Sequence, residues 1–377
     1  MDFLDWLTAY QDFDFELPKI TEEVLQVLHV STGECGVVIQ PAFQHEGSFC
    51  SSISIKISGN RITMSGNPSR YNRLDNLFGL TNLDDCFQIY NQILQGLGLP
   101  PFTKCTDVWH STEVKGSHSS SFTDGAVITR IDVTSNIQTG SRISSLEFIR
   151  ALSTQPYRNS TPRLHTNGCT ADWLSVNGKA SLIYATAYQK ANEMRLHSLR
   201  KIKNKYGTDS DEYKYLENII NYCDEKGIVR LEQKLKSAYL RRENLRYWGL
   251  SDEIKIFTVQ KEFLNIQEKL GRLVDMNPES ISQRLLNENI VETVRAANTT
   301  AFYAIEWSFG KTFDFTKSQT RVHSARLRKI GIDIKSSYDA NRFVPVRIIR
   351  GNEINTSYAE IPSWYITASK TSLRLVA

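Results

Sequence analysis

Alternating apolar and polar residues predict a hairpin followed by a helix in the first quarter of the chain. The isoleucines of residues 53–57 alternate with Ser and Lys, Gly59-Asn60 interrupts the pattern, and the alternation resumes over residues 61–65. This pattern is typical of two antiparallel strands joined by a two-residue turn. Thr81 or Asn82 can then cap a helix over about residues 83–97, where apolar residues recur every three or four positions.

Three later segments predict strands with one apolar and one polar face, over residues 126–134, 181–190 and 228–236. Side chains two positions apart lie on the same face of a strand. The side chains that share the polar faces are Arg130 and Asp132 in the first strand, Tyr184, Tyr188 and Lys190 in the second, and Arg230 and Glu232 in the third. Each strand therefore presents charge or a phenol on one side.

Helical periodicity lies between and after these strands, over residues 146–152, 192–205, 213–223, 238–248 and 253–270, and in several segments from 281 to 330. Strands grouped with helices predict an α+β fold, with an antiparallel sheet in residues 1–250 and a mainly helical region in residues 251–377. Within the second region, residues 300–309 and 317–330 outline a helix-turn-helix.

Composition places the chain among globular proteins. Of its 377 residues, 40% are hydrophobic and 23% are charged, which excludes a disordered or fibrous chain. The first residues are acidic where a signal peptide carries bases, and no apolar run approaches the roughly 18 residues of a membrane span. The six cysteines are scattered without a C-x-x-C pair, so we expect a reduced compartment and no structural zinc. These features predict a soluble cytoplasmic protein with no membrane partner.

Charge is unevenly distributed along the chain. The net charge of +4 permits nucleic-acid binding without requiring it, but residues 321–350 hold eight bases against two acids, whereas residues 1–30 hold seven acids against one lysine. The bases that the predicted second helix of the pair offers to phosphates are Arg321, Arg326, Arg328 and Lys329. The alternative is an ordinary solvated helix face.

Two Arg-x-acid pairs suggest a cation site. If their strands are neighbours, Asp132 and Glu232 can converge on one divalent cation, because Mg²⁺ prefers oxygen ligands and usually keeps several waters. The alternative is that Arg130 and Arg230 pair with acids across an exposed sheet face. The sequence leaves both interpretations open.

Tyr188 and Lys190 are candidates for nucleophilic chemistry. A phenol with a pKa of ~10 is a poor nucleophile at neutral pH unless a cation lowers its pKa or takes up its charge, and Lys190 or a metal can do so. The alternative is that Tyr184 and Tyr188 are aromatic strand residues that pack a helix. Other catalytic signatures are missing from the sequence: it contains no Walker A motif and no closely spaced histidine pair.

Several separated blocks resemble the filamentous-phage gene II and gene X replication proteins. They are residues 65–79, Thr129-Arg-Ile-Asp132, Tyr188-x-Lys190-x-x-Glu193-Met194, Val229-Arg-Leu-Glu232, and Trp307-x-x-Gly310 with residues 326–334. Their order and spacing cover about residues 50–335. The last block resembles the region shared with the gene X product, which implies a DNA-binding role for residues 251–377.

The resemblance implies a rolling-circle replication initiator with a Rep-like nicking-endonuclease fold. Such a protein nicks one strand of the double-stranded phage genome at its origin through a covalent tyrosine–DNA link, and later rejoins the displaced strand. It acts on double-stranded and single-stranded origin DNA, and a host replicative helicase is a further expected partner.

The roles that the resemblance implies fall on matching positions of this sequence. Tyr188 is the nucleophile, Lys190 and Arg130 assist it, and Asp132 and Glu232 hold Mg²⁺ or Mn²⁺. Tyr184 lies on the same strand face and is an alternate nucleophile, and His165 is a candidate additional metal ligand. The competing hypothesis is a non-catalytic origin-binding regulator of phage or plasmid replication.

Overall fold

The structure is a computed structural model that describes residues 1–21, 23–39, 41–47, 49, 52–111, 120–175, 177–266, 278–338 and 356–368. The end of the predicted helix 253–270 and the basic stretch beyond residue 338 lie outside the described residues.

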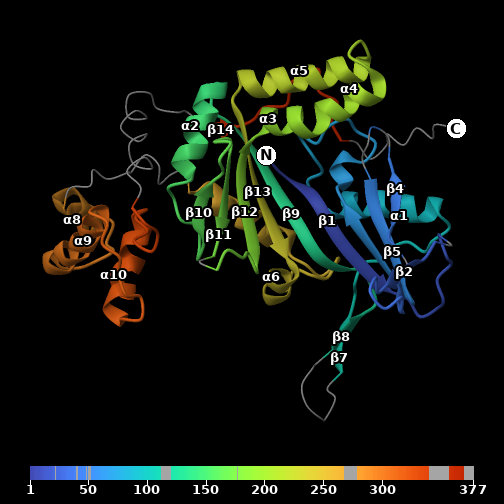
Figure 1. The fold of residues 1–377 in the computed structure, drawn as a ribbon, viewed down its shortest axis with the longest axis horizontal. Helices are drawn as coiled ribbons and strands as arrows, with labels where there is room; N and C mark the ends of the chain where they lie inside the picture. Colours follow the sequence, from blue (N-terminus) through green and yellow to red (C-terminus); the bar gives the residue numbers. More distant parts are fainter. Residues whose placement is uncertain are drawn as a thin grey trace.

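One large antiparallel sheet organises the molecule (Figure 1). Its strand order is β10-β11-β12-β13-β9-β1-β6-β5-β4, and the short β14 pairs with β9 at one end. The strands are β1 (Asp2–Asp12), β4 (Phe43–Glu46), β5 (Ser52–Ser58), β6 (Arg61–Gly66), β9 (Val127–Gln138), β10 (Thr161–Leu164), β11 (Thr170–Leu174), β12 (Ile183–Gln189), β13 (Ile228–Lys236) and β14 (Ser357–Tyr358). Two small hairpins stand apart: β2 (Leu25–Leu28) with β3 (Cys35–Ile39), and β7 (Val108–Ser111) with β8 (Ser120–Thr123).

The two faces of the sheet have different environments. The apolar face packs against α1 (Leu83–Gly96), α2 (Arg142–Leu152), α6 (Ser237–Arg242) and α7 (Glu253–Leu264). Leu7, Ile131 and Leu235 lie in this core at mutually paired positions. The opposite face carries the polar side chains of the central strands, because side chains alternate along each strand.

A helical unit covers one end of the polar face (Figure 1). It consists of α3 (Lys190–Met194), a π-helical turn (Arg195–Leu199), α4 (Arg200–Tyr206) and α5 (Asp211–Glu225). Its apolar side chains pack against Leu77, Phe78 and the first residue of β13, Ile228. The polar face is therefore closed at one end, where the loop of residues 67–79 also lies.

The C-terminal helices have a separate core. They are α8 (Pro278–Asn287), α9 (Val294–Ser308) and α10 (Ser318–Lys329), and the segment up to Ile334 packs with them. The sequence analysis assigns residues 253–264 to this region, whereas α7 contributes Ile256, Val259 and Phe263 to the cores beneath the sheet. The packing therefore ends the sheet domain after residue 266 rather than at residue 250.

Most of the predicted elements agree with the structure. The α+β class is confirmed, β5 and β6 form the predicted hairpin around Gly59-Asn60, and the Asn82 side chain caps α1 by accepting from the Asp85 backbone. The predicted helix 238–248 is wrong beyond residue 242, because Asn244 adopts a left-handed conformation with φ of 56° and the chain turns back toward β9. No helix in the described ranges is long and apolar enough to cross a bilayer.

Candidate active site on the polar face of the sheet

The three predicted strands are neighbours, in the order β12-β13-β9. Tyr188 pairs with Arg230, and Glu232 pairs with Thr134, so all four side chains lie on the polar face. Asp132 lies on the same face two residues from Thr134, diagonal to Glu232. The condition under which the two carboxylates approach each other is therefore met.

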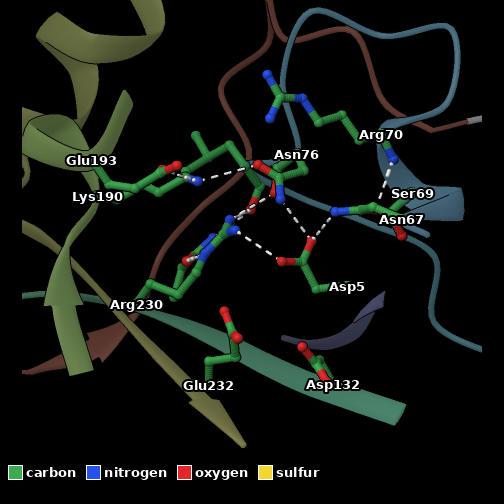
Figure 2. A network of polar contacts seen from close by, with 12 residues as sticks. Asp5, Asn67, Ser69, Arg70, Asn76, Asp132, Lys190, Glu193, Arg230 and Glu232 are labelled. Atoms are coloured by element: carbon green, nitrogen blue, oxygen red, sulfur yellow. Dashed lines mark hydrogen bonds and ion pairs between the residues drawn. The ribbon is translucent and has the colours of Figure 1, made fainter. Parts of the chain in front are cut away.

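A β-bulge adds Asp5, a residue that the sequence analysis did not identify. The pairing of β1 with β9 shifts between Leu4 and Trp6, so Asp5 is the extra residue of β1 at that point. Bulges re-aim a side chain and are common beside functional sites. Figure 2 shows the side chains of Asp5, Asp132 and Glu232 converging below Arg230. The sequence signal was present as acids in the first residues, but alternation alone placed none of them in a site.

Arg230 is the central cation of the site and is fully buried. Its guanidinium donates to the carbonyls of Asn76 (2.6 Å) and Leu77 (3.0 Å) and to Oδ1 of Asn136 (3.0 Å), and its Nη1 lies 3.6 Å from Oδ2 of Asp5. Burial alone would lower the pKa of Arg230, but the nearby Tyr188, Asp5, Glu193 and Glu232 raise it. Arg230 therefore stays charged beside Tyr188.

The Tyr188 hydroxyl donates to Oε2 of Glu232 at 3.2 Å. Burial and the Glu232 charge raise the pKa of Tyr188 well above its ordinary value, and Arg230 acts in the opposite direction. Burial and repulsion from Asp132 and Asp5 raise the pKa of Glu232 to about 7. A carboxylate with that pKa can accept a proton from a bonded hydroxyl at neutral pH.

Lys190 does not assist Tyr188 in the predicted way. The strand ends at Gln189 and Lys190 begins α3, so the two-residue rule that placed Lys190 beside Tyr188 no longer applies. Its ammonium is buried and donates to Glu193 (2.6 Å) and Asn76 (3.1 Å). Burial and the Arg230 charge lower the pKa of Lys190. Arg230 therefore has the position beside the phenol that the sequence assigned to Lys190.

Arg130 pairs with Asp132, as one of the two open interpretations stated. Its Nε and Nη2 donate to the two carboxylate oxygens at 2.8 and 2.5 Å, and the guanidinium stacks over the Trp6 ring at 4.7 Å. Burial still raises the pKa of Asp132 despite this partner. Among the described residues, Glu232 has no such directly bonded cation, since Arg230 faces Asp5 and the backbone instead.

Tyr184 belongs to a second cluster on the same face. Its hydroxyl donates to Oδ2 of Asp172 at 3.0 Å, Arg163 forms a bidentate pair with Asp172, and Nε2 of His165 lies 3.2 Å from the same carboxylate. Asp172 and Glu232 both flank Thr186, so they are two strands apart, ~10 Å. His165 therefore lies beside Asp172 and not beside the Asp132 and Glu232 pair.

The donor set suits a divalent cation only in part. Mg²⁺ sites commonly use one or two carboxylates and fill the remaining positions with water and substrate phosphate, which the Asp132 and Glu232 pair can provide. The repulsion that raises the pKa of Glu232 is the kind that a bound cation relieves. Within the described ranges, however, no group of three or more His, Cys, Asp or Glu side chains is arranged to hold a metal ion. The residues fit a cation that is completed by substrate.

The predicted DNA-binding bases lie on α10. Arg321 and Lys329 are exposed, and Arg326 is partly exposed. Arg328 instead turns toward the sheet domain, where its Nη2 donates to the Arg158 carbonyl at 2.7 Å. Residues 309–317 separate α9 from α10, which is longer than the three- to four-residue turn of a helix-turn-helix.

These features define an antiparallel α+β protein with a tyrosine, a carboxylate and a buried guanidinium joined on the open face of its sheet. The comparisons with known proteins identify the family. The family model for the N-terminal part of the phage gene II replication-associated protein matches residues 3–255, and the model for its C-terminal part matches residues 285–371. The chain belongs to this family of filamentous-phage replication initiators, so the resemblance found in the sequence is confirmed.

A curated relative agrees with the family models. The gene II replication-associated protein of Escherichia phage If1 is 48% identical over 317 residues, which cover 84% of this chain and 98% of the relative. No solved structure matches this chain.

Proposed function

We propose that this replication initiator cuts one strand of double-stranded phage DNA at the origin, by attack of the Tyr188 oxygen on a phosphodiester. The observation that carries the proposal is the hydrogen bond from the Tyr188 hydroxyl to Glu232, beside the buried charge of Arg230. A tyrosine is activated by an adjacent base and by a cation that stabilises the phenolate. Both groups lie next to Tyr188.

Each of these residues has one task in the proposed step. Glu232 accepts the phenolic proton, the Tyr188 oxygen forms a bond to phosphorus, and the bond from phosphorus to the 3′ oxygen breaks. The 3′ oxygen leaves with a proton as a hydroxyl, and the 5′ phosphate stays on Tyr188. Arg230 stabilises the phenolate before attack.

The phosphotyrosine link keeps the energy of the phosphodiester bond. Attack by a 3′-hydroxyl on the same phosphorus therefore rejoins a strand without ATP, which agrees with the missing Walker A motif. The displaced single strand is the substrate of this rejoining step. Recruitment of a host helicase stays a prediction from the resemblance.

Asp132 and Glu232 are the residues that would hold Mg²⁺ or Mn²⁺. A bound cation would supply charge stabilisation at the phosphate oxygens and orient the phosphate. Arg130 holds the Asp132 carboxylate in place through two hydrogen bonds, so Arg130 acts on the carboxylate rather than on the tyrosine.

The test uses a single-stranded origin oligonucleotide and the full chain with Mg²⁺. The expected product is a covalent protein–DNA adduct that mass mapping locates on the peptide containing Tyr188, together with nicking of supercoiled origin plasmid. An adduct on Tyr184 would overturn the assignment. Origin binding without any adduct or nick would instead favour the non-catalytic regulator.

A further inference from the structure

The chain returns to the sheet domain after the C-terminal helices. Residues 356–366, which we call the C-terminal strap, include β14, where Ser357 pairs with Gln138 and Tyr358 with Ile137 of β9 (Figure 1). The family model for the C-terminal part of the replication-associated protein includes this segment. The strap therefore belongs to the C-terminal region by sequence and to the catalytic domain by packing.

Tyr365 anchors the strap and is only 7% exposed. Its hydroxyl donates to Oδ1 of Asp75 at 2.6 Å and accepts from Nη2 of Arg73 at 2.7 Å and from the Phe78 backbone at 3.0 Å. Nη2 of Arg73 also donates to the Ile366 carbonyl at 2.7 Å. A single hydroxyl thus fixes both ends of the loop from residue 73 to residue 78.

That loop holds the polar groups of the candidate site. Asn76 donates to Asp5 at 2.7 Å and accepts from Lys190 at 3.1 Å, while the carbonyls of Asn76 and Leu77 both accept from Arg230 (Figure 2). The Tyr365 hydroxyl is therefore linked to Arg230 through one short loop.

A second connection runs through β9. The backbone of Ala359 in the strap donates to the Asn136 carbonyl at 2.9 Å. The Asn136 side chain accepts from Nε of Arg230 at 3.0 Å and donates to the Leu77 carbonyl. The strap thus contacts both groups of residues that hold the guanidinium.

We infer that the C-terminal strap is a positioning element of the candidate site, in which Tyr365 fixes the loop of residues 73–78 and so holds Arg230 against Tyr188. This inference rests on the proposed function. Tyr365 touches no reacting atom and acts through Asn76, Leu77 and Arg230. The catalytic site is then incomplete without a segment that follows the C-terminal helices.

The first test compares Tyr365→Phe with wild type in the full chain. The substitution keeps the ring and removes the hydroxyl, so we expect an adduct rate lower by about 10-fold, with affinity for origin DNA unchanged. The pH profile of the adduct rate should move to higher pH, since a less well placed Arg230 stabilises the phenolate less. Tyr358→Phe is the matched control, because the Tyr358 hydroxyl lies beside Asp2 and not beside the loop; it should leave rate and profile unchanged.

A double-mutant cycle separates positioning from general loss of stability. The effects of Tyr365→Phe and Asn76→Ala on the adduct rate should be less than additive, because both act through the same loop. Tyr365→Phe with Lys329→Ala should be additive, since Lys329 lies on α10. Thermal melting of each variant measures the folded fraction.

The outcomes distinguish this inference from the proposed function. An unchanged pH profile in Tyr365→Phe, or additivity with Asn76→Ala, would overturn the role of the strap while wild-type activity still supports the Tyr188 chemistry. Absence of an adduct in wild type would overturn the proposed function itself.

Discussion

The polar face of the sheet carries two tyrosine–carboxylate pairs that look alike and differ in their charge. In one pair the Tyr188 hydroxyl donates to Glu232, and in the other the Tyr184 hydroxyl donates to Asp172. Both tyrosines come from β12 and share one face, four residues apart. Sequence patterning alone therefore treats them as equivalent.

Their carboxylates have opposite pKa shifts. Burial raises the pKa of Asp172, but hydrogen bonds from Arg163, His165 and Tyr184 outweigh burial and lower it. Glu232 lacks a directly bonded guanidinium in the described part of the chain, so burial and the neighbouring acids raise its pKa to about 7. Asp172 is thus a weak base that holds structure, and Glu232 is a base suited to neutral pH. The comparison teaches that the position of the arginine, not of the tyrosine, separates the two pairs.

The largest effect that tests this comparison is loss of the nucleophile. Tyr188→Phe should lower strand cleavage and joining by at least about 10³-fold, because it removes the attacking oxygen and keeps the ring. Tyr184→Phe should lower cleavage by less than about 10-fold, because its hydroxyl bonds a structural carboxylate. Adduct capture on an origin oligonucleotide measures both rates; similar losses in the two variants would erase the distinction between the pairs.

Metal dependence should belong to the Glu232 side only. Asp132→Ala and Glu232→Ala should each abolish nicking of origin plasmid and leave origin binding largely intact, whereas Asp172→Ala should keep Mg²⁺-dependent nicking. EDTA should abolish nicking in wild type, and Mg²⁺ or Mn²⁺ should restore it. Full activity in EDTA would remove the cation from the proposal.

The pH dependence of stability should have opposite signs at the two acids. The pKa of Glu232 in the folded chain lies above its ordinary value of 4.5, so ionised Glu232 opposes folding increasingly as pH rises from about 4.5 through about 7. Glu232→Gln should therefore raise Tm at pH 8 and leave it unchanged at pH 4.

Asp172 provides the control for that measurement. Its pKa in the folded chain lies below its ordinary value of 3.8, so its ionised form stabilises the fold above that pH and the effect is lost as pH falls. Asp172→Asn should lower Tm at pH 8, with a smaller difference in strong acid. Melting curves across pH test both acids, and equal signs for the two variants would contradict the assignment.

The smallest expected effect lies outside both pairs, on α10. Replacing exposed Arg321 or Lys329 by Ala should weaken binding to all DNA sequences and reduce the salt slope by about one phosphate contact each. Arg328→Ala should change the slope less, because its side chain contacts Arg158 and Asp333. Binding titrations at several salt concentrations, made in the Tyr188→Phe background, separate these contacts from cleavage. Equal slopes in all variants would return α10 to a solvated helix face.

Much of the fold followed from local patterns. The hairpin around Gly59-Asn60, the capped helix α1 and the central strands each follow from alternation or helical periodicity within a few residues. Tyr188, Asp132 and Glu232 were found in the same way and lie on one face, as alternation requires. The errors occurred where a pattern was extended past its end, as at Lys190, which begins a helix, and beyond Arg242, where Asn244 turns the chain.

The sequence by itself determined the family, the α+β class and which side chains share a strand face, because all three depend on local spacing and on motifs that stand in the chain. Only the tertiary structure decided which cation faces which acid. The bulge at Asp5, the neutralisation of Asp172 by Arg163, and the strap that brings Tyr365 to the loop below Arg230 join residues far apart in sequence. Burial and pairing set charge and pKa, and both depend on distances that no local pattern contains.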